Sequence, residues 1–131
     1  ITPIMKKLLI LLFSILISFN SYGEWTKLSQ NDHAAYFVEL DTVKTINGYI
    51  YWWSLSNYIK PNEWGDISAK IFFQGECELK SFKYLSDAYY KEPMGQGTPS
   101  SSSNIPDEEW DYAPPNSSME EEMEFICDNV K

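Results

Sequence analysis

The chain of 131 residues is 44% hydrophobic and 16% aromatic, which is enough for one domain with a modest core. It contains 19 acidic residues against 10 lysines and no arginine, and its formal net charge is −9. This balance makes nucleic acids and anionic membranes poor partners, because both repel a negative surface.

Residues 1–23 have the pattern of a secretory signal peptide, with a few extra residues before Met5. Two lysines follow Met5, an apolar run broken only by serines extends from Leu8 to Phe19, and residues 21–23 supply the small side chains of a cleavage site. The run of 12 residues is too short to span a membrane, which takes about 20. We therefore expect residues 24–131 to form one exported domain, with no membrane span after cleavage.

The charge of this expected domain is unevenly distributed. Without the signal peptide the chain has 8 lysines against 19 acidic residues, or a net charge of −11. Residues 24–91 carry −2, whereas residues 92–130 contain 10 acidic residues and no basic one. A basic protein surface would be attracted to this second half. The simpler interpretation is that the acidic residues keep an exported protein soluble.

The first half of the domain predicts strands separated by polar turns. Strands are expected at residues 25–28 and 36–40, and Asn47 with Gly48 forms the signal of a type I′ hairpin turn. The next strand, residues 49–60, is the longest of the three. Its core face is expected to consist of Tyr49, Tyr51, Trp53, Leu55 and Ile59.

Two further strands follow, and the first has the clearer pattern. Residues 68–77 alternate with a period of two, whereas in residues 80–91 Leu85 interrupts the alternation. A loop rich in Pro, Gly and Ser at residues 92–104 and a short edge strand at residues 108–112, with its tryptophan turned inward, complete the expected sheet. Strands joined by short turns and followed by one helix predict an antiparallel meander with the helix on one side.

A helix is expected from Ser117 to Asp128. Ser117 and Glu120 form a capping box, in which Glu120 is expected to reach back to the Ser117 amide, and the three glutamates 120–122 place negative charge in the first turn. A helix of about three turns is marginal alone in water, so it needs a surface to lie on. Its expected apolar face consists of Met119, Met123, Ile126, Cys127 and Val130, with Phe125 pointing elsewhere.

The two cysteines of the chain, Cys77 and Cys127, are expected to form a disulfide between the strand at residues 68–77 and this helix. The period of two places Cys77 on the apolar face of the strand, where the helix must dock. Closing a loop of about 50 residues stabilises a domain by about 4 kcal/mol in the chain-entropy model. The alternative is a pair of unpaired buried cysteines.

The sequence shows no arrangement typical of a catalytic or metal centre. His33 is the single histidine and lies on a polar turn, and no nucleophile, zinc or phosphate-binding motif occurs. The acidic run at residues 107–111 lacks the ligand spacing of a calcium loop and is interpreted as solvated charge. Rigid aromatic side chains are favoured in protein interfaces, although each can equally belong to the core. The candidate protein-binding aromatics are Trp52, Tyr58, Trp64 and Tyr89.

Short motifs are spread over nearly all of the chain after residue 23. They are Glu24-Trp25, Tyr36-Phe37-Val38 with Asp41, Trp53-x-Leu55-x-x-Tyr58-x-x-Pro61, Lys70 ahead of Cys77, Pro93-Met94-Gly95-x-Gly97, Trp110, Pro114-Pro115-x-Ser117 and Cys127. In order and spacing the chain resembles the bacterial surface-adhesin protein E family. The resemblance implies an α+β fold: a six-stranded antiparallel sheet whose concave face carries a C-terminal helix tied by the disulfide. It also implies an exported protein of a Gram-negative bacterium, in the periplasm or on the outer cell surface.

We therefore expect a non-enzymatic binding protein without cofactor or metal. Its partner is expected to be a protein, and the resemblance implies adhesion to host extracellular matrix proteins. The alternative is a periplasmic inhibitor of a basic host enzyme such as lysozyme, which the acidic second half favours. A hydrolase is a third hypothesis and would need a pocket with two facing carboxylates. An exposed strand edge is also able to join two copies into a homodimer.

Overall fold

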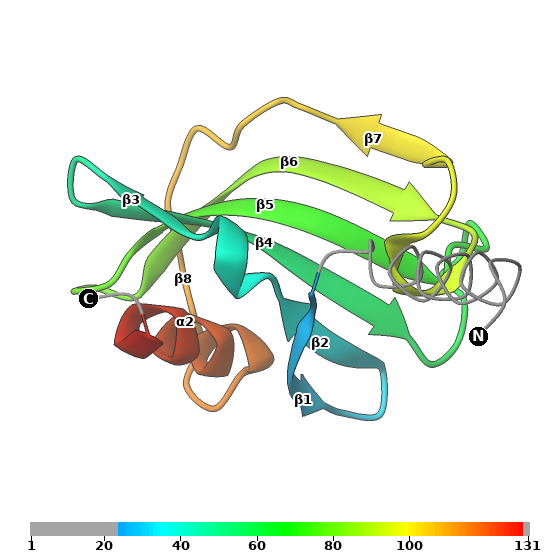
Figure 1. The fold of residues 1–131 in the computed structure, drawn as a ribbon, viewed down its shortest axis with the longest axis horizontal. Helices are drawn as coiled ribbons and strands as arrows, with labels where there is room; N and C mark the ends of the chain where they lie inside the picture. The colour runs from blue at the N-terminus through cyan, green and yellow to red at the C-terminus, as the bar shows by residue number, and fades with distance from the viewer. Residues whose placement is uncertain (1–23, 130–131) are drawn as a thin grey trace, which may run out of the picture.

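The computed structural model describes residues 24–129 as one twisted sheet with a helix against it (Figure 1). The expected signal peptide, residues 1–23, and Val130 lie outside the described residues. None of the helices within residues 24–129 has the length and apolar character that a membrane crossing requires. The strands are β1 (Thr26–Gln30), β2 (Ala34–Val38), β3 (Lys44–Ile46), β4 (Tyr49–Tyr58), β5 (Ser68–Glu76), β6 (Ser81–Tyr90), β7 (Ser101–Ser103) and β8 (Asp111–Tyr112); the helices are η1 (Leu40–Thr42), η2 (Pro93–Gly95) and α2 (Ser118–Asn129).

The sheet is antiparallel at each described strand pair. Its main path runs in the order β1-β2-β4-β5-β6-β7, while β3 pairs with β4 and β8 pairs with β6. The expected fold class, a six-stranded antiparallel sheet with one C-terminal helix, is confirmed, with two short strands added at its margins. Because neighbours along the chain are mostly neighbours in the sheet, short turns are sufficient to build it.

The turn between β3 and β4 is the expected Asn-Gly hairpin. Asn47 and Gly48 have φ values of 52° and 83°, and Ile46 pairs with Tyr49 across the turn. Two successive positive φ angles define a type I′ turn, whose twist matches that of the flanking strands. The local sequence is therefore enough to determine this part of the fold.

The core lies between α2 and one face of the sheet, which we call the helix face. Met123 and Ile126 of α2 are completely buried against Trp52 of β4, Phe73 of β5 and Phe82 of β6. The Trp52 and Phe73 rings stack with their centroids 5.3 Å apart, and Phe82 meets Phe73 edge-on at 5.8 Å. Buried rings of this size contribute strongly to the stability of a core.

The expected core face of β4 is wrong. Trp52 and Ile50 face the helix, and the alternate set that begins with Tyr49 points to the opposite side of the sheet, where Tyr49 is 36% exposed. Apolar side chains stand on both faces of this strand, so alternation alone cannot identify the face that the helix covers. Leu55, a member of the predicted set, is nevertheless fully buried on the opposite face.

That opposite face is covered in part by η2. The amide of Met94 donates to the Asn57 side chain at 2.8 Å, and the amide of Gly95 donates to the Ser68 hydroxyl at 2.8 Å. Gly95 has a φ of 63°, and a Cβ there would lie 2.5 Å from Cε of Lys70. The glycine-containing motif thus serves a tight backbone bend over the sheet.

A β-bulge explains the interrupted alternation of β6. Phe72 pairs with Ser86 and Phe73 with Tyr84, so the register shifts at Leu85. Before the bulge Tyr84 shares the helix face with Phe73, and after the bulge that face passes to the odd-numbered residues, including Tyr89. One extra residue reverses the side on which each later side chain points.

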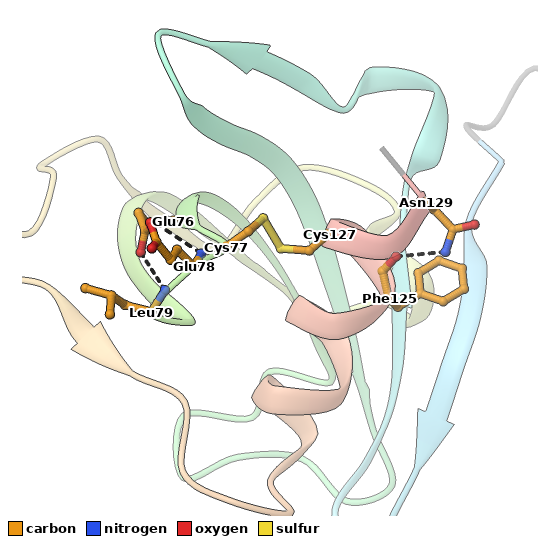
Figure 2. Close-up of a disulfide and its surroundings, with 7 residues drawn as sticks. All are labelled: Glu76, Cys77, Glu78, Leu79, Phe125, Cys127 and Asn129. Atoms are coloured by element: carbon orange, nitrogen blue, oxygen red, sulfur yellow. Dashed lines mark hydrogen bonds between the residues drawn. A yellow bond between two sulfur atoms is a disulfide. The ribbon is translucent and has the colours of Figure 1, made fainter. Parts of the chain in front are cut away.

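The helix and its disulfide are confirmed, but Phe125, which was expected to point elsewhere, is partly buried and packs against the core. Cys77, which follows β5, is bonded to Cys127 in the last turn of α2 across a sequence separation of 50 residues. Figure 2 shows that the side chain of Glu76 stabilises the turn after β5. Its carboxylate accepts hydrogen bonds from the backbone amides of Glu78 and Leu79 at 3.1 and 2.8 Å. The bond therefore connects two locally ordered segments.

The segment between β6 and α2 is more ordered than its composition predicts. Within the expected loop at residues 92–104, the serines 101–103 form β7, which pairs with the end of β6. The expected strand at residues 108–112 is reduced to the two residues of β8. Trp110, which was expected to turn inward, is half-buried and lies outside the core; it stacks on Tyr49 on the opposite face, with ring centroids 5.5 Å apart.

Candidate functional site

The helix face is covered by α2 over one end of the sheet only. In Figure 1, α2 lies below the end that carries the β3 hairpin, while the arrowheads of β4 and β6 mark the other end. By strand register Tyr36, Tyr58 and Tyr89 all stand on the helix face at this second end. Two pockets open there and share Tyr89 as a lining residue. We call this region the open groove.

The larger pocket of the open groove, which we call the Trp64 pocket, has a volume of about 550 Å³. Trp64 is 72% exposed, an unusual position for the largest apolar side chain. Tyr89 on β6 forms the opposing aromatic wall. The lining residues are Trp64, Asp66, Tyr89, Lys91, Ser100 and Ser101.

Asp66 holds the loop that presents Trp64. Its carboxylate accepts hydrogen bonds from the Ser100 hydroxyl at 2.6 Å and from Nζ of Lys91 at 2.9 Å. Lys91 also donates to the carbonyl of Trp64. The hydroxyl of Ser100, followed by Lys91, lowers the pKa of Asp66 below its ordinary value. A carboxylate held by several donors makes this loop a fixed platform.

Asn62 completes the turn from inside the loop. Its side-chain oxygen accepts hydrogen bonds from the backbone amides of Trp64 and Asp66 at 3.0 and 2.8 Å. The backbone amide of Asn62 donates to the backbone carbonyl of Asp66 at 2.9 Å. Asn is favoured in turns because its short side chain replaces a backbone partner in this way. The backbone of Trp64 is therefore held by hydrogen bonds at both its amide and its carbonyl.

Of the four aromatics predicted to bind a partner, three lie at the open groove. Trp64 and Tyr89 line the same pocket, and Tyr58 stands close to both Tyr89 and Asp66. Burial, followed by the proximity of Tyr89 and of the Asp66 carboxylate, raises the pKa of Tyr58 to about 12. Their role in binding stays a prediction, but the fold brings together residues that are up to 31 positions apart.

The fourth prediction, Trp52, is wrong as an interface residue. Its side chain is completely buried beneath α2, and its indole nitrogen donates to Oε2 of Glu122 at 3.0 Å. The prediction failed for the same reason as the predicted core face of β4, since the side that the helix covers is decided by docking and not by the strand. In the described structure Trp52 has no exposed surface to offer a partner.

Glu122 is the residue that sequence reasoning missed. It is 4% exposed, and its other carboxylate oxygen accepts from the hydroxyl of Ser54 at 2.9 Å. Burial raises its pKa to about 7, although the two hydrogen bonds act in the opposite direction. A signal for this position existed, because Glu122 lies three residues after Met119 and four before Ile126, on the apolar face of the helix.

The other residues considered from the sequence show no built centre. His33 is exposed on the turn between β1 and β2. Asp107, Glu108, Glu109 and Asp111 line a shallow depression, but within residues 24–129 no three His, Cys, Asp or Glu side chains are placed to hold a metal ion.

A single antiparallel sheet with a disulfide-bonded C-terminal helix defines a small α+β protein, and an aromatic groove opens at the uncovered end of the sheet. The chain belongs to the surface-adhesin protein E family, whose sequence model matches residues 25–128. Among curated proteins, none matches the sequence significantly.

Solved structures of Haemophilus influenzae protein E are similar to this chain. Crystal form II of that protein has a TM-score of 0.61 and 16% sequence identity, and the match covers 82% of this chain and 90% of the other. The selenomethionine form has a TM-score of 0.60 and 15% identity, covering 82% and 88%. Protein E from non-typeable Haemophilus influenzae has a TM-score of 0.56 and 15% identity, covering 82% and 78%. At this identity the likeness establishes the shared fold.

Proposed function

We propose that the protein is an exported, non-enzymatic binding protein that adheres to host extracellular matrix proteins through the open groove. Membership of the surface-adhesin protein E family supports this role. The sequence also carries none of the motifs that catalytic nucleophiles or metal hydrolases require.

The observation that carries the proposal is the exposure of Trp64 on a fixed loop. A tryptophan that is 72% exposed leaves a large apolar surface in water, and such surfaces mark contact sites when they are rigid. The network around Asp66 and Asn62 holds the backbone of the loop from which this side chain extends, and Trp64 and Tyr89 line the same pocket. Pre-ordering of this kind lowers the entropy lost on binding.

Binding to surfaces coated with laminin or vitronectin tests the proposal. We expect saturable binding by the wild-type protein at micromolar concentration and a loss of about tenfold or more in the Trp64→Ala variant, as for an interface hot spot. Leu79→Ala is the matched control, because Leu79 is 64% exposed on the turn beside the disulfide, outside the groove. No saturable binding, or an equal loss in both variants, would refute the proposal.

Display on the outer surface requires export, which the expected signal peptide at residues 1–23 would provide. Fractionation of the bacterial cells, combined with protease treatment of intact cells, tests this step. Digestion of the protein in intact cells supports adhesion, whereas full protection until the outer membrane is opened would place it in the periplasm and remove adhesion as its role.

A second candidate function is the inhibition of a basic host enzyme such as lysozyme. It is favoured by the acidic residues 107–111, which gather on one surface depression in the half of the chain that has no basic residue before residue 131. A lysozyme activity assay distinguishes the two functions. Inhibition that weakens as salt is added would support this candidate, since opposite surface charges are screened within about 10 Å at 0.1 M salt.

Self-association is a separate proposal that concerns the ends of the sheet. The main strand path ends at β1 and β7, whose outer edges have no described strand partner, and such edges can pair with a second copy. Sedimentation analysis across a range of protein concentrations tests it. A constant monomer mass at high micromolar concentration would rule it out.

A further inference from the structure

The smaller pocket of the open groove lies on the other side of Tyr89 from the Trp64 pocket and has a volume of about 250 Å³. We call it the Tyr84 pocket. Its floor is formed by β5 and β6, and one wall is the segment that follows β7. The residues lining it are Ile71, Tyr84, Ser86, Asp87, Tyr89, Ile105 and Asp107.

Two carboxylates belong to this pocket and no basic side chain lines it. Asp87 extends from β6, and Asp107 is fixed across from it by two contacts with Tyr84: its carboxylate accepts from the Tyr84 amide at 3.2 Å, and its own amide donates to the Tyr84 carbonyl at 2.9 Å. The ion pairs found within residues 24–129 involve Asp66 and Glu124 and not these two aspartates. The negative charge of the pocket is thus left without a cation from this part of the chain.

The tyrosine rings of the pocket also have no cation over their faces from the described residues. Elsewhere the protein places its own lysines over aromatic faces, with Nζ of Lys70 5.3 Å from the Tyr90 ring centre and Nζ of Lys83 4.9 Å from that of Trp110. Within residues 24–129 no such cation lies over Tyr84 or Tyr89. Burial raises the pKa of Tyr84, and the nearby charges of Asp111 and Asp107 act in the same direction, so two carboxylates lie close to this side chain.

We propose that the Tyr84 pocket binds one arginine side chain of a protein partner, a proposal that rests on the proposed binding function of the open groove. A guanidinium group stacks on aromatic faces and forms paired hydrogen bonds with carboxylates, so Tyr84, Tyr89, Asp87 and Asp107 offer both of its preferred contacts. The methylene stem of arginine lies against Ile71 and Ile105. Lysine offers a point charge without the planar group and binds more weakly.

Two aspartates in one pocket are also what the hydrolase hypothesis needs, but their setting favours cation binding. The carboxylate of Asp107 already accepts a hydrogen bond from the Tyr84 amide at 3.2 Å, and the two tyrosine rings beside it suit a planar cation.

Nuclear magnetic resonance titration of the isotope-labelled protein tests the proposal without any matrix protein. The probes are Nα-acetyl-arginine amide, its uncharged analogue Nα-acetyl-citrulline amide, and Nα-acetyl-lysine amide. With the arginine probe we expect saturable chemical-shift changes in the signals of Tyr84, Asp87, Tyr89 and Asp107. The affinity for the citrulline probe should be lower by at least about tenfold, and the affinity for the lysine probe should lie between the two.

The variants Asp87→Asn and Asp107→Asn should each weaken arginine binding several-fold, and Asn keeps the acceptor that position 107 needs for the Tyr84 amide. Glu108→Gln is the matched control, because it removes one charge from the adjacent residue, which does not line the pocket. Unchanged thermal melting shows that each variant is folded. Equal binding of arginine and citrulline, equal effects of the three variants, or no saturable shift would overturn the proposal.

This outcome is independent of the matrix-binding assay. Arginine binding without adhesion would refute the proposed function and leave the site, whereas adhesion without arginine binding would refute the site alone.

Discussion

Glu122 illustrates how a single side chain can make the stability of a small domain depend on pH. Its carboxyl group sits under α2 with Trp52 and Ser54 as its hydrogen-bond donors, and burial raises its pKa from 4.5 to about 7. Between these two values the folded protein holds a proton that the unfolded chain has released. The free energy of unfolding therefore falls as the pH rises from 4.5 to 7 and changes little from this group outside that interval.

The substitution Glu122→Gln should remove this dependence. The amide can accept from the Trp52 indole and donate to the Ser54 hydroxyl, so the contacts are kept while the ionisation is lost. Between pH 4.5 and pH 8 we expect the wild-type protein to lose roughly 3 kcal/mol more than the variant, as a shift of 4.5 to about 7 implies. Urea unfolding at several pH values measures this difference.

The control for this measurement is Glu121→Gln, which removes a neighbouring charge that is exposed on the same helix. It should follow the wild-type pH profile. A Glu122→Gln variant whose stability keeps the wild-type pH dependence would show that the group does not hold its proton in the folded state.

Gly75 lies where the core has no room for a larger side chain. A Cβ at this position would lie 2.6 Å from the Trp52 ring, and the ring is already fixed by Phe73 and by Glu122. We expect Gly75→Ala to destabilise the protein by about 1–3 kcal/mol, as overpacking of a core does. Gly48→Ala is unsuitable as a control because of its positive φ, so the exposed Ser102→Ala serves instead. An unchanged thermal midpoint for Gly75→Ala would contradict the observed contact.

At the scale of the elements, α2 begins at the residue that the capping motif predicts, directly after Ser117. The hydroxyl of Ser117 accepts from the amide of Glu120 at 3.1 Å, while the Glu120 carboxylate accepts from the amide of Asn116 at 3.3 Å and not from Ser117 as expected. Glu122 lies beyond the first turn, whose acidic residues are Glu120 and Glu121. The hydrogen bond to Ser117 follows the capping box, whereas the bond to the Glu120 carboxylate comes from Asn116, one residue earlier than the motif predicts.

Removal of this cap should have a measurable and limited cost. We expect Ser117→Ala to lower the free energy of unfolding by about 1 kcal/mol, because the amide of Glu120 loses its acceptor. Ser118→Ala, one residue into the helix, is the control and should change stability by less than about 0.5 kcal/mol. Denaturant unfolding compares the two, and equal effects would argue against the cap.

In the molecule as a whole, one covalent bond connects the last helix to the sheet. A domain of this size is stabilised by roughly 5–15 kcal/mol, so the closure of a 50-residue loop is a large share of the total. The other interactions of α2 with the sheet include Met123 and Ile126 in the core and an exposed ion pair between Lys80 and Glu124. Exposed ion pairs contribute little, so the helix is held by its apolar contacts, the buried hydrogen bonds to Glu122 and the disulfide.

The double variant Cys77→Ser, Cys127→Ser should lose about 4 kcal/mol of stability relative to the oxidised protein. Unfolding in guanidinium chloride with and without a reductant measures this loss. The reductant should destabilise the wild-type protein to the same extent and leave the double variant unchanged. A loss below about 1 kcal/mol would mean that packing alone holds α2 in place.

Several parts of the fold depend only on residues that are close in the chain, and these could be predicted from the sequence. Asn47 with Gly48 specified a hairpin, the Ser-x-x-Glu pattern specified the start of α2, and the presence of two cysteines specified the disulfide. These features follow from backbone geometry, local hydrogen bonds and simple counting. The strand formed by serines 101–103 escaped prediction because it has no apolar pattern and forms only beside β6.

Tertiary packing alone decides which side of β4 faces the helix. It therefore also decides the burial of Trp52 and Glu122. Packing also gathered Trp64, Tyr89 and Asp107 into one groove from segments with no sequence relation. Strand alternation fixes which side chains share a face, but both faces of this sheet are apolar. The free energy of docking one helix, which buries one face and leaves its far end open, is a property of the whole chain and not of any window within it.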